Sequence, residues 1–206
     1  MKVHILEKAT ELFTRHGIRS VTMDDVSKHL SISKKTLYQH FTDKDDLVET
    51  IVIAQVKITE QNCQEFRKKA ENAVEEMILI LEFMNIYFAQ RNPTSFHDLQ
   101  KYYPKAWAHF THHKENFLRK SIEDNLKRGV KEKLFHPDLN VNIVSRLRME
   151  QVECVFNHEL FPASQFNMQL VHDQSMKLYM YGITTLKGHQ LINKYLSKLN
   201  KKKQKV

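Results

Sequence analysis

Apolar residues recur at intervals of three and four positions along most of the 206-residue chain. This spacing gives an α-helix one continuous apolar face, so the pattern predicts a series of amphipathic helices. Sustained alternation of apolar and polar residues is absent, as are the Asn-Gly and Asp-Gly dipeptides typical of β-hairpins. Glycine and proline are scarce, with four of each. The chain is therefore expected to be all-α.

The boundaries of the helices follow from this periodicity and its interruptions. Residues 2–16 carry the first apolar stripe, and Gly17 is expected to end that helix as a left-handed cap. A loop is expected over residues 129–139. The predicted helices are 2–16, two short helices within 22–41, 43–67, 69–91, one starting at residue 94 or 95, a long one ending at Gly129, 140–157, 165–181 and 186–199.

A short stretch near the N-terminus carries three signals for the start of a helix. Thr22 is followed three residues later by Asp25, so its hydroxyl can accept an early amide proton while the carboxylate faces the positive end of the helix dipole. Ser33 is expected to cap the next short helix in the same way, and Thr42 with Asp45 repeats the device. The stretch thus predicts two short helices, a tight turn and the opening of a third helix.

The second of these short helices has two different faces. Leu37 and Phe41 lie four residues apart and are expected to point inward. At about 100° per residue, Lys35 and Gln39 fall on the opposite face. The residues that flank this face are also polar and include no carboxylate: Lys34, Thr36, Tyr38 and His40.

A rigidly held helix with such a face is suited to reading the major groove of DNA. Lys35 is expected to donate to guanine and Gln39 to pair with adenine, while Tyr38, His40 and Lys44 are better placed to touch phosphates. The spacing alone fits an ordinary helical hairpin with a solvated polar face equally well.

Several motifs occur together between Ala9 and Leu47. They are Ala9-x-x-Leu12-Phe13, Gly17, Thr22, Val26-x-x-x-Leu30-x-Ile32-Ser33, Thr36-Leu37-Tyr38-x-His40-Phe41 and Lys44-x-x-Leu47. Because of these motifs, the segment from Ala9 to Leu47 resembles the N-terminal DNA-binding domain of TetR-type repressors. The chain departs from the pattern at Ser31, where many members carry glycine, and serine tolerates a left-handed backbone less well.

The resemblance implies an N-terminal three-helix helix-turn-helix domain over residues 1–48 and a larger helical domain for ligand binding and dimerisation over 49–199. Residues 200–206 are expected to be a disordered basic tail. In this family the helix that starts near residue 43 links the ligand site to the DNA-binding heads. The DNA-contacting residues implied by the resemblance are Thr22, Lys34, Lys35, Thr36, Tyr38, Gln39, His40 and Lys44.

The middle third of the chain is rich in aromatic residues, which at helical spacing usually form a core. The resemblance implies instead a pocket for a small apolar or amphipathic effector, because the family has one in this region. Its expected walls are Phe83, Met84, Tyr87, Phe96, Tyr103, Trp107 and Phe110, with Met149 and Val152 opposite.

Two helices near the C-terminus, 140–157 and 165–181, carry more apolar surface than a lone surface helix needs. Pairing with their symmetry mates would form a four-helix interface and hence a homodimer. Burial of both helices within the same chain is the alternative.

The net charge of +8 indicates a polyanionic partner, but its distribution matters more than its total. Five of the positive charges are lysines in the last nine residues, and residues 1–50 are balanced in charge. The prediction of double-stranded DNA as partner therefore depends on where the basic groups lie. The lysine-rich end is expected to solubilise the protein and to add at most weak, salt-sensitive affinity for DNA.

Other functions find little support in the sequence. Cys63 and Cys154 form no motif, no signal peptide is visible, and the most apolar stretch, 77–88, is too short to span a membrane, so a cytoplasmic protein is expected. His109 and His113 lie four residues apart, but no third metal ligand is evident. No cofactor or catalytic motif occurs.

The expected function is that of a homodimeric transcriptional regulator, a repressor that binds a palindromic operator. The first alternative is a DNA-binding protein of the same fold that has no effector and organises the chromosome. The second is an α-helical enzyme or ligand carrier that contains a helical hairpin.

Overall fold

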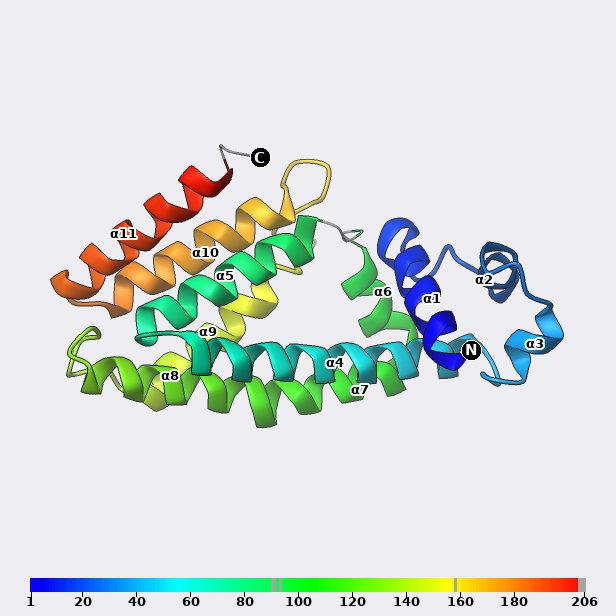
Figure 1. The fold of residues 1–206 in the computed structure, drawn as a ribbon, viewed down its shortest axis with the longest axis horizontal. Coiled ribbons are helices and arrows are strands. Elements are labelled where there is room, and N and C mark those ends of the chain that lie inside the picture. The colour runs from blue at the N-terminus through cyan, green and yellow to red at the C-terminus, as the bar shows by residue number, and fades with distance from the viewer. Residues whose placement is uncertain (90–91, 93, 158, 204–206) are drawn as a thin grey trace. The chain divides into compact units, whose positions relative to one another are not determined.

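A computed structural model of the protein describes residues 1–89, 92, 94–157 and 159–203. These residues form helices and loops and contain no strand, which confirms the all-α prediction (Figure 1). The helices are α1 (Lys2–His16), α2 (Met23–His29), α3 (Lys34–Tyr38), α4 (Lys44–Lys69), α5 (Ala73–Ala89), α6 (Ser95–Tyr102), α7 (Pro104–His113), a π-helix (Lys114–Leu118), α8 (Arg119–Lys131), α9 (Val141–Cys154), α10 (Met168–Ile183) and α11 (Leu186–Lys203).

Several predicted helix ends differ from the structure: the second short helix ends at Tyr38 rather than near Phe41, and the helix predicted over 140–157 ends at Cys154. Two further differences lie at the C-terminal ends of α8 and α11. Helix α8 continues to Lys131, so Gly129 lies inside the helix rather than at its end. The ring of Phe135 lies so close to Gly129 that an added Cβ would meet it at 2.2 Å, which explains why a glycine is needed there. Helix α11 runs to Lys203, past its predicted end at residue 199; the rest of the predicted basic tail, 204–206, lies outside the described residues.

The chain divides into two compact units, and α4 contributes to both. Unit 1 comprises residues 1–59 and 90–113, and unit 2 comprises residues 60–89 and 114–206. None of the helices in the described parts of the chain is both long and apolar enough to cross a membrane.

Unit 1 has a single apolar core shared by α1, α2, α3, the start of α4 and the α6–α7 region. The first helix buries Ile5, Ala9 and Phe13, as its apolar stripe predicts. From α6, the buried carboxylate of Asp98 accepts a hydrogen bond from the backbone N–H of Arg19 at 3.2 Å. This bond fixes the loop between α1 and α2 to α6.

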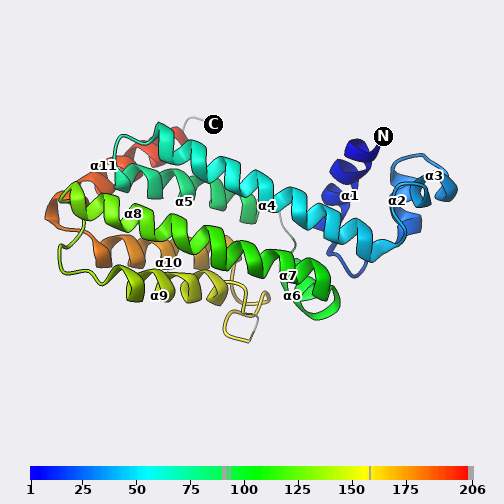
Figure 2. The same cartoon turned by 90° about the horizontal axis from the view of Figure 1, so that it is seen from below.

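Unit 2 is arranged around α5, which packs against α8, α10 and α11 (Figure 1). Helix α5 buries a broad apolar face that includes Val74, Met77, Ile78 and Leu81, as expected of a helix with several neighbours. On another side of the unit, α9 packs against α8 (Figure 2).

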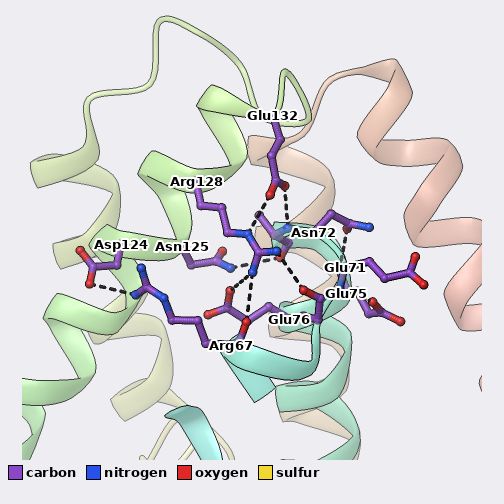
Figure 3. Close-up of polar contacts among 11 residues, drawn as sticks. Arg67, Glu71, Asn72, Glu75, Glu76, Asp124, Asn125, Arg128 and Glu132 are labelled. Carbon is purple, nitrogen blue, oxygen red and sulfur yellow. Dashed lines mark hydrogen bonds and ion pairs between the residues drawn. The ribbon is translucent and has the colours of Figure 1, made fainter. Parts of the chain in front are cut away.

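An arginine of α8 joins the end of α4 to the start of α5 (Figure 3). Arg128 donates from Nη2 to the carbonyl of Ala70 at 2.9 Å and from Nη1 to that of Arg67 at 3.4 Å, so it satisfies carbonyls left open at the C-terminus of α4. Its Nε lies 2.7 Å from a carboxylate oxygen of Glu132. The other oxygen of Glu132 accepts from the N–H of Ala73, the first residue of α5, at 2.8 Å. We call Arg128 and Glu132 the α4–α5 clamp.

Glu76 of α5 completes this network, with Oε2 at 3.2 Å from Nη1 of Arg128. The side chain of Glu76 is only 6% exposed. Burial raises the pKa of this carboxyl group, and the hydrogen bond from Asn125 and the charge of Arg128 oppose the shift. Without Arg128, the buried carboxylate of Glu76 would lose the positive charge that offsets the cost of its desolvation.

We expect Arg128→Met to lower the free energy of unfolding by about 3 kcal/mol, because it strands the charge of Glu76 and the carbonyls of α4. Urea denaturation followed by circular dichroism measures this. Lys127→Met, at an exposed position of the same helix, is the control and should cost little. Adding Glu76→Leu to Arg128→Met should recover part of the loss; no recovery would mean that the buried charge is not its cause.

Candidate nucleic-acid interface

Helix α3 and the turn that follows it, residues 39–41, are oriented by the side chains that they bury. Leu37 and Phe41 are 0% and 1% exposed in the core of unit 1, while Lys35 and Gln39 are exposed. The predicted division of this helix into an inward and an outward face is therefore confirmed. Because α3 spans only five residues, its backbone depends on tertiary packing and on its caps for stability.

Both predicted caps of the helical hairpin are present. The Thr22 hydroxyl accepts from the N–H of Asp25 at 3.2 Å, and the Asp25 carboxylate accepts from the N–H of Thr22 at 2.9 Å, which makes a complete capping box for α2. At the start of α3, the Ser33 hydroxyl accepts from the N–H of Thr36 at 3.0 Å. The N-terminus of α3 is thus held by its own side chains.

The third start signal uses different residues from those predicted. Helix α4 begins at Lys44, so the residue that caps it is Asp43, whose carboxylate accepts from the N–H of Asp46 at 2.8 Å. Asp46 in turn accepts from the N–H of Thr42 at 2.9 Å. The predicted pairing of Thr42 with Asp45 is wrong, because Thr42 lies one residue too early to be the cap.

The turn between α2 and α3 contains a serine in the left-handed region. Ser31 has φ 54°, where a glycine is favoured. The N–H groups of Ser31 and Ile32 donate to the carbonyls of Lys28 and Ser27, each at 3.0 Å, which holds the turn closed. The departure from glycine at this position therefore places strain in the turn that fixes the angle between the two helices.

The side chains on and beside the polar face of α3 differ in whether they have partners within the protein. Lys34 forms an ion pair with Asp24 of α2 at 2.5 Å, and the hydrogen bond that its ammonium donates to this carboxylate raises the lysine pKa. A carboxylate that belongs to α2 thus lies at the edge of the polar face of α3. Lys35 has no ion-pair partner among the described residues, and Tyr38 is 49% exposed.

The remaining predicted contacts are less accessible. Thr36 and His40 are half-buried, and the hydroxyl of the exposed Thr22 is engaged with Asp25 at 2.6 Å. Each of these residues lies on or beside the hairpin, but the contact with DNA itself stays a prediction.

Lys44 has internal partners. Its Nζ donates to the carbonyl of Arg19 at 3.2 Å and lies 5.9 Å and 5.8 Å from the ring centroids of Phe13 and Tyr103. Partial burial lowers the pKa of this amine. Lys44 thus joins the start of α4 to the loop after α1, and a phosphate would have to compete with these contacts.

The expected effector-pocket residues fall into both units. In unit 1, Phe96, Trp107 and Phe110 form a ring cluster with centroids 4.9–5.2 Å apart, and Tyr103 is buried in the core. In unit 2, the rings of Phe83 and Tyr87 lie 6.3 Å apart, Met84 and Val152 are half-buried, and Met149 is buried. A single pocket lined by all nine residues stays a prediction.

The histidine and cysteine residues form no evident reactive site in the described parts of the chain. Nε2 of His109 lies 2.8 Å from a carboxylate oxygen of Glu49, and no three potential ligands converge there on a metal position. Both cysteines are free, and burial raises the pKa of the Cys63 thiol to about 11, which keeps it protonated at neutral pH.

Sequence reasoning missed the long-range partners that hold this interface. No local sequence signal predicts the pairing of Asp24 with Lys34 or of Asp98 with Arg19, because the residues of each pair meet only in the folded protein. The acidic pair Asp43 and Asp46 did have a signal, because they stand three residues apart at the start of an apolar-periodic segment.

Comparison with known proteins places this hairpin among regulators of transcription. Residues 5–51 match the profile described as bacterial regulatory proteins, tetR family. Over 183 residues the chain is 23% identical to the HTH-type transcriptional repressor KstR2 of Mycobacterium tuberculosis, with 87% of this chain and 91% of that protein covered.

Solved structures show the same fold. A TetR-family transcriptional regulator from Agrobacterium tumefaciens matches with a TM-score of 0.73 at 17% identity, covering 89% of this chain and 97% of that one. The transcriptional regulator FadR from Bacillus subtilis, in complex with stearoyl-CoA, matches with a TM-score of 0.66 at 13% identity, covering 89% and 100%.

We expect Ser31→Gly to raise the free energy of unfolding by about 0.5 kcal/mol, because relief of the left-handed backbone outweighs the added freedom of the unfolded chain. Urea denaturation of the full chain measures the change. Ser164→Gly, at an exposed position that does not have a positive φ, should be neutral or slightly destabilising. Equal destabilisation by both substitutions would show that Ser31 is not strained.

Proposed function

Because the chain belongs to the TetR family of bacterial regulatory proteins, we propose that it is a ligand-responsive transcriptional repressor that binds a palindromic operator as a homodimer. The observation that carries this proposal is the orientation of α3. Leu37, buried in α3, and Phe41, buried just after it, turn Lys35 and Gln39 outward, and the helix is capped at its N-terminus.

The polar face of α3 suits the major groove. The amine of Lys35 matches the O6 and N7 acceptors of guanine, and the amide of Gln39 matches the donor and acceptor pair of adenine. The flanking Tyr38 and His40 are suited to backbone phosphates, which position a protein without specifying sequence. The ion pair with Asp24 leaves Lys34 less available than Lys35.

A second copy of the chain would cover the apolar side chains that α9 and α10 expose. Ile143 and Leu147 on α9 are 56% and 59% exposed, and Leu170 and Leu178 on α10 are 58% and 73% exposed. Each pair shares one face of its helix. Helices within 140–157 and 165–181 would then form a four-helix interface, and the two-fold axis would present two α3 helices about 34 Å apart to a palindrome.

The proposed division of labour follows the predicted domains: DNA binding by residues 1–48, and ligand binding and dimerisation by 49–199. Helix α4 belongs to both parts and would transmit a tilt as a rigid body. A small apolar or amphipathic effector that changes the separation of the two heads would weaken operator binding. A coupling of about 1–3 kcal/mol corresponds to roughly 5- to 150-fold in affinity. The FadR structure with stearoyl-CoA supports an effector with an apolar chain.

Selection of bound fragments from random DNA by the purified protein tests the proposal. The expected result is a palindromic consensus whose half-sites lie about one helical turn apart. A protein that recovers no consensus, or that ignores duplex DNA at low salt, would not be this kind of regulator.

We expect Gln39→Ala to weaken operator binding by about 1–3 kcal/mol and to relax specificity at one base position, because Gln39 is the proposed adenine contact. Titration of operator and scrambled duplexes by fluorescence anisotropy measures both effects. Gln190→Ala, an exposed glutamine of α11, is the control and should change neither. An equal loss of affinity for operator and scrambled DNA would refute the role assigned to Gln39.

Replacement of Leu147 and Leu178 by glutamate should convert the dimer to a monomer, since each charge would be buried in the apolar interface. Sedimentation velocity measures the oligomeric state. Leu186→Glu, at a leucine that is 81% exposed on α11, is the matched control and should leave the dimer intact. A dimer that survives the double substitution would exclude this face as the interface.

A further inference from the structure

Unit 2 contains a buried arginine that has no anionic partner among the described residues. Arg148 on α9 is only 6% exposed. Its guanidinium lies 3.4 Å from Oε1 of Gln151, 3.4 Å from Oγ of Ser175 and 3.0 Å from Sδ of Met176, and it sits 4.9 Å from the ring centroid of Tyr179. All four partners are neutral, and two of the three polar contacts are long.

This environment is unusual for a group that stays charged. A buried guanidinium normally has a carboxylate partner, because desolvation of the charge is costly. Even the half-buried Arg128 in the same unit has carboxylate partners, with Glu76 and Glu132 within 3.2 Å. For Arg148, burial lowers the pKa, and only Tyr179 opposes the shift. The uncompensated charge marks a place where an anion would be strongly favoured.

A second polar group without a partner lies on the same stripe of α10 as the contacts of Arg148. His172, Met176 and Tyr179 are spaced four and three residues apart and are all buried. Nδ1 of His172 has no hydrogen-bond partner. Burial and the nearby charge of Arg148 lower the histidine pKa to about 4, so the ring is neutral near pH 7 and can donate one N–H.

The third unpartnered group comes from α5. Oδ1 of Asn85 is buried without a partner, one helical turn before Phe88. The ring of Phe88 lies 4.9 Å from that of His172 and 5.5 Å from that of Phe156, and Tyr87 lies 5.6 Å from Phe88. Three helices thus bring polar groups with unused hydrogen-bonding capacity to the edge of an aromatic cluster.

We propose that Arg148 binds the carboxylate of an amphipathic organic acid, with His172 as a second donor and the aromatic cluster around Phe88 in contact with its apolar body. This inference rests on the proposed ligand-responsive function and names the class of effector. A carboxylate has two oxygens that can accept from two donors, and charge-assisted hydrogen bonds of this kind are the strong ones. A hydroxyl or amide on the same acid would satisfy Asn85.

A carboxylate from a second copy of the chain is the main competing partner for Arg148. The position of Arg148 argues against it. Arg148 shares the buried side of α9 with Ser145 and Met149, whereas the face proposed for dimerisation carries the exposed Ile143 and Leu147. The guanidinium therefore faces the interior of its own unit.

Calorimetric titration of the full-length protein tests the inference, with decanoate, decyl phosphate and the neutral 1-decanol as probes. Decanoate should bind at least tenfold more tightly than 1-decanol. Arg148→Met should weaken decanoate binding 10- to 100-fold, the loss expected for a charged hydrogen bond. Arg148→Lys should retain part of the affinity, because it keeps the charge. Tighter binding of decyl phosphate than of decanoate would overturn the assignment of a carboxylate.

Thermal unfolding and sedimentation of the variants separate binding from folding. Arg148→Met should melt at or above the temperature of the unsubstituted protein, because it removes an uncompensated buried charge without removing packing volume. The inference would be overturned if Arg148→Met bound decanoate as tightly as the unsubstituted protein does. It would also be overturned if the unsubstituted protein bound decanoate and 1-decanol equally, or bound neither. Dissociation of Arg148→Met into monomers would show that Arg148 stabilises the dimer interface, and this result would also overturn the inference.

Operator binding distinguishes this failure from failure of the proposed function. If the protein binds its selected operator but no organic acid, only the inference about Arg148 fails. If it binds decanoate through Arg148 but no specific DNA, the acid site stands and the repressor function fails.

Discussion

Burial of Leu37 and Phe41 is the constraint on which the arrangement of unit 1 depends. A helix of five residues has too few internal hydrogen bonds to persist alone, so the direction of α3 is set by Leu37, by Phe41 in the turn that follows it and by the cap at Ser33. Once these two side chains are inside, helix geometry leaves Lys35 and Gln39 no position except the surface. The chemistry of this outward face is therefore a consequence of packing.

Unit 2 shows how differently two arginines can be used, one half-buried and one buried. Arg128 has two carboxylates and two backbone carbonyls as partners, and together with Glu132 it closes the junction between α4 and α5 (Figure 3). Arg148 has neutral partners only. The guanidinium of Arg128 stabilises the fold through its ion pairs. The guanidinium of Arg148 has no ion pair within the described chain, which is typical of a site that binds an external ligand.

Much of the fold and part of the site could be predicted because their signals are local. Helical periodicity, the Thr22 capping box and the two faces of α3 each depend on residues within one or two turns. Contacts between distant segments could not be predicted: nothing near Lys44 announces the carbonyl of Arg19, and nothing near Asp98 announces the N–H of Arg19. The spacing of the aromatic residues along the sequence predicts which helix faces they occupy, but it does not reveal that these residues are divided between two units.

The ring cluster of Phe96, Trp107 and Phe110 has an optical consequence. Trp107 is the only tryptophan of the chain, and its ring lies 5.2 Å from Phe96 and 5.1 Å from Phe110, all within unit 1. Its emission spectrum therefore reports the surroundings of a ring cluster in unit 1. Arg148 belongs to unit 2, so a change in this emission on addition of an organic acid would be a spectroscopic record that binding by residues of unit 2 alters the environment of a side chain of unit 1.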